Sequence, residues 1–167
     1  MITLSVAIEA EGWAAAGDVE AWAYRAVEAA LASLPERPDG DQTVDLLLTD
    51  DAAIRELNRA WRGQDKATNV LSFPSPPFPA RSGVPRHLGD IALAYETVRR
   101  EAGDEGKSLA AHVSHLVVHG LLHLLGHDHG TDGDAAAMER IEAEALARLG
   151  IPDPHAAAIA REPAEAP

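Results

Sequence analysis

The sequence contains no cysteine among its 167 residues. This absence excludes disulfide bonds, thiolate zinc sites, iron–sulfur clusters and cysteine nucleophiles. Any metal that the protein binds must therefore be held by nitrogen and oxygen ligands, and histidine is the residue type of greatest interest.

Long hydrophobic runs are also absent. No segment approaches the ~18 consecutive apolar residues that a membrane-spanning helix needs, and the first residues, MITLSVAIEAEG, have no basic segment before the apolar stretch. We therefore expect a cytoplasmic protein that makes no membrane contact. The length and the 46% hydrophobic content predict one domain over residues 1–151, followed by a flexible tail over 152–167.

Basic residues are few, with 14 Lys and Arg against 27 Asp and Glu, so the formal net charge is −13. An evenly spread charge of this size would argue against binding nucleic acid, because phosphate contacts dominate that affinity. The charge is uneven, however, since residues 55–86 contain six Lys or Arg and only two acidic residues. On charge alone, a solvated helix face and loop is the simpler explanation of this cluster.

Hydrophobic periodicity predicts an α+β domain in which a four-stranded mixed sheet packs against helices. Proline-rich residues 75–86 should form an exposed loop. The helix over 108–126 is apolar or histidine-bearing on every side, which predicts a central, buried helix. The expected strands cover 2–8, 43–48, 68–73 and 88–94, and the expected helices cover 18–34, 50–63, 95–103, 108–126 and 132–149.

The segment HGLLHLLGHDH, residues 119–129, carries the candidate metal site. His119 and His123 are one helical turn apart, so both imidazoles project from the same face. Gly126 can adopt the left-handed conformation that ends a helix and turns the chain back toward the ion, which brings in His129. Three neutral imidazoles leave one coordination position open, as in a catalytic zinc site.

Other polar residues in or near this segment are expected to support the site rather than to be its main ligands. We expect His112 and His115, on the same helical face, to orient the ligands or to fill the core, because an open site needs only three protein ligands. Asp128 can orient a histidine or cap the turn, and His127 is an alternative metal contact.

The spacing HxxxHxxGxxH also occurs in zinc proteases, so a peptidase is an alternative. In those enzymes a glutamate follows the first histidine and acts as the general base, whereas this chain has Gly120. Glycine has no side chain that could accept a proton, which argues strongly against a protease.

The histidine segment resembles the signature of the YbeY family of endoribonucleases. The segment WRGQDKATNVLSFP, residues 61–74, looks like a second motif of that family, and LGDI, residues 88–91, matches a third. Order and spacing agree over about residues 43–150. Two departures are visible, since Ala67 and His127 stand where proline and an aromatic residue are common, but neither removes a ligand.

The resemblance implies a metal-dependent hydrolase that cleaves single-stranded RNA and acts in small-subunit (16S) rRNA maturation and ribosome quality control. It implies that His119, His123 and His129 hold one Zn²⁺ ion and that ribosomal RNA and the small ribosomal subunit or its assembly proteins are partners. It also assigns Arg62 a catalytic role, which chemistry supports because a guanidinium can hold two phosphoryl oxygens as they gain charge. The alternative is a ribosome-associated assembly factor whose metal is mainly structural.

Overall fold

The computed structural model describes residues 1–76, 83–128 and 130–154. Its centre is one four-stranded sheet with the spatial order β1-β2-β4-β3. The strands are β1 (Ile2–Ile8), β2 (Gln42–Thr49), β3 (Val70–Pro74) and β4 (Arg86–Ala94). β1, β2 and β4 are parallel, and β3 runs antiparallel to β4 at one edge, so the predicted mixed sheet is confirmed.

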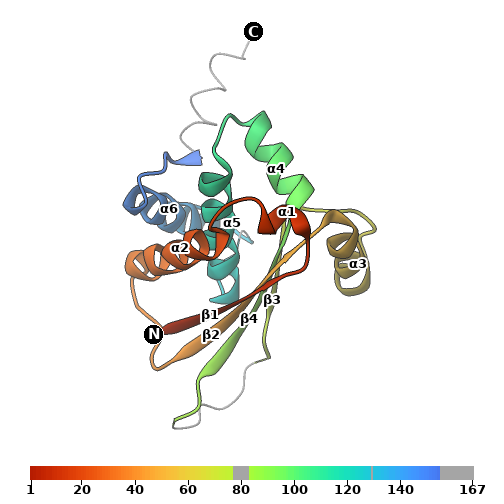
Figure 1. The fold of residues 1–167 in the computed structure, drawn as a ribbon. Helices are drawn as coiled ribbons and strands as arrows, with labels where there is room; N and C mark the ends of the chain where they lie inside the picture. The colour runs from red at the N-terminus through yellow and green to blue at the C-terminus, as the bar shows by residue number, and fades with distance from the viewer. Residues whose placement is uncertain (77–82, 129, 155–167) are drawn as a thin grey trace.

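Helices cover the two faces of the sheet unequally (Figure 1). One face packs against α2 (Val19–Ser33), α5 (Leu109–Leu124) and α6 (Asp132–Arg148), and most buried apolar side chains lie in this layer. α3 (Asp51–Arg62) lies on the opposite face and shares a smaller apolar cluster with it. α5 contacts both the sheet and the two other helices of its layer, which makes it the predicted central helix.

Side-chain caps define where several helices begin. The side chains of Asp18, Asp50 and Ser108 accept hydrogen bonds from the first turns of α2, α3 and α5. Gly63 and Gly126 follow α3 and α5 with φ angles of 67° and 94°, values that glycine adopts without steric cost.

The structure also departs from the predicted elements. A short helix, α1 (Glu11–Ala14), was not predicted, and it places Trp13 in the core, where its indole N–H donates to the Thr49 carbonyl at 2.8 Å. α4 (Tyr95–Asp104) agrees with the expected helix, whereas β3 begins two residues later than predicted. Trp61, in the last turn of α3, is 73% exposed.

Some predictions concern residues outside the described ranges. These are half of the proline-rich loop, including Arg81, and most of the predicted C-terminal tail. Among the described residues, no helix is long and apolar enough to cross a membrane.

Candidate functional site

The first two predicted ligands meet as the helix geometry requires. His119 and His123 lie on successive turns of α5 with ring centroids 4.5 Å apart. Their Nε2 atoms face each other at 3.0 Å, so both imidazoles are directed at one point. Two nitrogen ligands of one tetrahedral zinc ion, each about 2.0–2.1 Å from it, would stand at a comparable separation.

The third predicted ligand, His129, lies outside the described residues, so its contacts with the other two histidines stay a prediction. The turn that leads to it is described. Gly126 has the left-handed conformation that was predicted, and the His127 N–H donates to the Leu122 carbonyl at 2.9 Å, which reverses the chain after α5. The chain therefore turns back beside His123.

A cleft of about 330 Å³ opens in front of the two histidines. This volume lies at the lower end of the range for small-molecule sites, ~300–1,000 Å³. β3, the end of α5 and the following turn form most of its wall. The lining residues are Arg62, Val70, Leu71, Ser72, Pro74, His119, His123, Gly126, His127 and Asp128.

Arg62 reaches this cleft from the last turn of α3. Its Nη2 donates to the Ser72 carbonyl at 2.8 Å, and its guanidinium carbon lies 6.0 Å from the centroid of the Phe73 ring. Because β3 is an edge strand, its outward carbonyls do not pair within the sheet and can hold a side chain. The sheet edge thus fixes a permanent positive charge in the same cleft as the histidines.

The other arginines of α3 have different surroundings. Arg55 pairs with Asp65 at 2.7 Å and Arg59 pairs with Glu56 at 2.7 Å, and all four side chains are exposed. The hydrogen bond from Arg55 holds the pKa of Asp65 below its ordinary value. These two guanidiniums lie on a solvated helix face, which was the simpler explanation of the basic cluster.

Gly120 explains why α5 can lie so close to the sheet. A Cβ atom at this position would stand 3.1 Å from both Ile91 Cγ2 and Ser72 Oγ, and the Ser72 hydroxyl donates to the Gly120 carbonyl at 3.2 Å. The space that a side chain at position 120 would enter is therefore already occupied by side chains of the sheet. A glutamate here, as in the zinc proteases, would crowd the Ile91 and Ser72 side chains and require them to shift.

A residue that the sequence analysis missed completes the environment of the histidines. Glu142 of α6 is buried, with only 1% of its side chain exposed, and its Oε1 lies 2.6 Å from His119 Nδ1. Its other oxygen lies 3.4 Å from His115 Nε2, so His115 and the predicted ligand His119 contact the same carboxylate. Glu142 occupies the inner face of α6 together with Met138, Ile141, Ala145 and Leu146. A charged residue at that apolar position was the signal available in the sequence.

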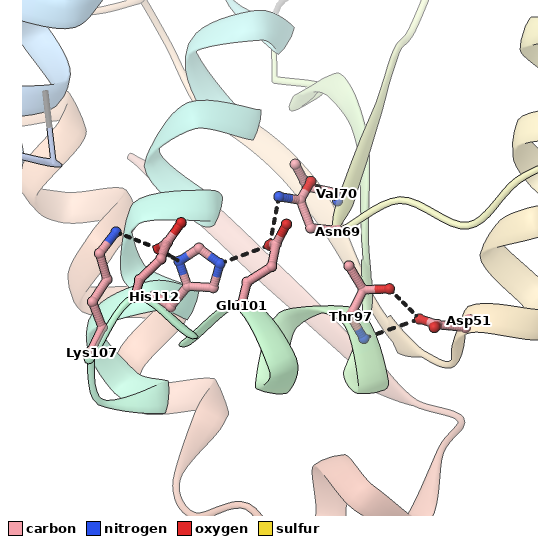
Figure 2. Close-up of polar contacts among 8 residues, drawn as sticks. Asp51, Asn69, Val70, Thr97, Glu101, Lys107 and His112 are labelled. Atoms are coloured by element: carbon pink, nitrogen blue, oxygen red, sulfur yellow. Dashed lines mark hydrogen bonds and ion pairs between the residues drawn. The ribbon is translucent and has the colours of Figure 1, made fainter. Parts of the chain in front are cut away.

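His112 belongs to a separate network at the start of α5. Its Nε2 lies 2.9 Å from Glu101 Oε1, and the same oxygen accepts a hydrogen bond from Asn69 Nδ2 at 2.9 Å. Figure 2 shows Glu101 between these two side chains, so it links α4, α5 and the start of β3. The predicted core role of His112 agrees with this position.

A second group of side chains that could bind a metal ion lies on the other face of the sheet. One ligand atom each from Asp45, His87 and Asp90 lies within 4.8 Å of the others, and this group could hold a divalent ion. His87 and Asp90 are three residues apart, so a regular strand would direct them to opposite faces. A register shift in β4 inserts one residue between them and brings both to the face of Asp45.

The comparisons with known proteins agree with the sequence resemblance. The family model described as Endoribonuclease YbeY matches residues 7–150. The curated Endoribonuclease YbeY of Nitrobacter winogradskyi is 53% identical over 154 residues, covering 90% of this chain and 80% of that protein. Its counterpart in Rhodopseudomonas palustris strain BisA53 is 52% identical over 153 residues and covers 90% and 88% of the two chains.

A solved structure shows the same fold. The solution structure of TM1509 from Thermotoga maritima is similar with a TM-score of 0.54 at 24% identity, covering 88% of this chain and 91% of that one. The predicted resemblance is thereby confirmed at the level of the family, and the protease alternative has no support. The chain belongs to the YbeY family of endoribonucleases.

Proposed function

We propose that this protein is a zinc-dependent endoribonuclease that cleaves single-stranded RNA in 16S rRNA maturation and ribosome quality control. One ion would be held by His119, His123 and His129. The observation that carries the proposal is the pair of Nε2 atoms facing each other at 3.0 Å in a cleft that also contains Arg62. The cytoplasm and the small ribosomal subunit are the corresponding location and partner.

The residues fit a catalytic zinc site. Imidazole nitrogen is a ligand that zinc prefers, and three protein ligands leave a fourth position for water or substrate. The Nδ1 atom of His119 lies beside the Glu142 carboxylate, an arrangement that recurs around zinc-binding histidines. When bound, the ion supplies Lewis-acid activation of the attacking water and of a phosphoryl oxygen.

The protein's own contribution to the chemistry is charge stabilisation and positioning. The Arg62 guanidinium stabilises the negative charge that builds on the phosphoryl oxygens during phosphodiester hydrolysis. Its anchor on the Ser72 carbonyl orients it before substrate arrives, so little reorganisation is needed in the transition state. Gly120 cannot act as a base, and the titratable side chains that line the described cleft besides Arg62 and the two histidines are His127 and Asp128.

The surface beside Arg62 suits a single-stranded polynucleotide. Trp61 precedes Arg62 in the chain, is 73% exposed, and packs edge-to-face on Phe73 with ring centroids 6.3 Å apart. Exposed aromatic rings next to basic side chains stack the unpaired bases of single strands. A duplex keeps its bases stacked inside, so this surface favours unpaired RNA.

The test uses the purified full chain loaded with one equivalent of Zn²⁺. We expect it to cleave a labelled single-stranded RNA and to leave the same sequence intact within a duplex. Removal of zinc with a chelator should stop cleavage, and added zinc should restore it. Cleavage that persists at an undiminished rate in the metal-free chain would show that the proposed metal-dependent function is wrong.

A further inference from the structure

Glu142 stands in an unusual position for a carboxylate. Its side chain is only 1% exposed, and it projects from the apolar face of α6 toward α5. Burial of an ionised carboxylate is costly unless hydrogen-bond partners replace water. Its two oxygens lie 2.6 Å from His119 Nδ1 and 3.4 Å from His115 Nε2.

This contact determines which nitrogen of His119 carries the proton. An ionised carboxylate only accepts hydrogen bonds, so His119 Nδ1–H is the donor to Glu142 Oε1. A neutral imidazole has one N–H, and Nε2 of His119 is then left with its lone pair. That lone pair faces His123 Nε2, at the point where the ion would be held.

We infer that Glu142 is a positioning residue, which fixes the tautomer and the ring orientation of His119 so that Nε2 is the ligating atom. This inference rests on the proposed metal site and adds to it the group that prepares one ligand. His115 contacts the second carboxylate oxygen and holds Glu142 in the orientation that His119 needs. α6 thereby contributes to a proposed metal site whose two described ligands, His119 and His123, lie on α5.

The chain contains a matched control for this inference. Glu101 is the carboxylate partner of His112, at 2.9 Å, and His112 lies on α5 two turns before His119. Glu101 and Glu142 thus make the same kind of contact with the same helix, but only Glu142 contacts a proposed ligand. Glu142→Gln and Glu101→Gln each remove one negative charge and keep the size of the side chain.

The first experiment measures the zinc dissociation constant of the full chain by competition with a chromophoric chelator, for the wild type and both variants. Loss of such a partner weakens metal binding by about 10- to 100-fold, which we expect for Glu142→Gln. Glu101→Gln should bind zinc within about twofold of the wild type, because its histidine is not a ligand. Unchanged zinc affinity in Glu142→Gln would overturn the inference.

The second experiment uses only the wild-type chain, so it does not require the Glu142→Gln variant to fold. Ring-nitrogen NMR of the zinc-loaded wild-type chain should show His119 with the metal on Nε2 and the proton on Nδ1. Metal on Nδ1 of His119 would overturn the inference even if Glu142→Gln proved unstable. A wild-type chain that binds no zinc would instead overturn both the proposed function and this inference. The zinc titration of the wild type therefore distinguishes failure of the proposed function from failure of the Glu142 inference alone.

Discussion

In the described part of the chain, two groups of side chains that could bind a metal lie on opposite faces of one sheet, and they differ in burial and in the contacts that hold them. His119 and His123 project from a buried helix into a cleft, and a buried carboxylate contacts one of them. Asp45, His87 and Asp90 lie on neighbouring strands, and their side chains are 59%, 38% and 54% exposed.

The difference shows why residue type alone does not define a site. The exposed side chains remain largely hydrated, so replacing an ion's water ligands with these groups gains little free energy. The α5 pair is held by helix geometry and by Glu142, so much of the cost of ordering the ligands is met during folding. We therefore expect function to depend on the histidine pair, and four changes test that expectation.

The largest effect should come from His123→Ala. Removal of one of three ligands should abolish stoichiometric zinc binding and lower RNA cleavage to background, at least ~10³-fold. His87→Ala removes a histidine from the exposed group and is the matched control, with cleavage expected near the wild-type rate. Metal analysis and single-turnover cleavage of both variants decide between the groups, and the reverse result would assign the catalytic ion to β2 and β4.

The second-largest effect is expected for Arg62→Ala, because this substitution tests charge stabilisation without removing a metal ligand. Arg62→Ala should lower the single-turnover cleavage rate by about 10²-fold while zinc content stays at the wild-type level. Arg62→Lys should not restore the rate, because a point charge does not replace the planar guanidinium. Arg59→Ala is the control on the same helix, since Arg59 pairs with Glu56 in solvent. A wild-type rate for Arg62→Ala at saturating protein would remove its catalytic role.

The sequence predicted the histidine helix because all of its signals are local. His119, His123 and Gly126 lie within two turns, so the 3.6-residue period and one helix-ending glycine determine their geometry. The second group was not predicted, because it depends on strand order and on a bulge in β4, which are set by pairing between distant segments. Glu142 was missed for the same reason, since the contact between α6 and α5 is tertiary.

The exposed aromatic residue beside the cleft should have an intermediate effect. Trp61→Ala should weaken binding of a single-stranded RNA by about 5- to 150-fold, the range that ~1–3 kcal/mol of base stacking gives. Tyr24→Ala removes another exposed aromatic side chain, on α2, and should change affinity little. Fluorescence titration checks both, and an RNA with abasic sites should bind the wild type and Trp61→Ala equally if stacking is the cause.

The smallest effect is expected for Asp45→Asn, which changes only the exposed group. His87 Nε2 lies 3.9 Å from Asp45 and 3.2 Å from Asp90, while Thr43 Oγ1 lies 2.8 Å from His87 Nδ1, so His87 has other partners when the Asp45 charge is lost. An exposed pair of this kind contributes at most about 1 kcal/mol, so the thermal midpoint should shift by only a few degrees. Cleavage rate and zinc stoichiometry at micromolar zinc should remain those of the wild type. The opposite result would be a wild-type chain that binds a second equivalent of zinc, with that equivalent lost and cleavage slowed in Asp45→Asn. The exposed group would then be a functional metal site, and the difference in preorganisation would not predict which group binds the catalytic ion.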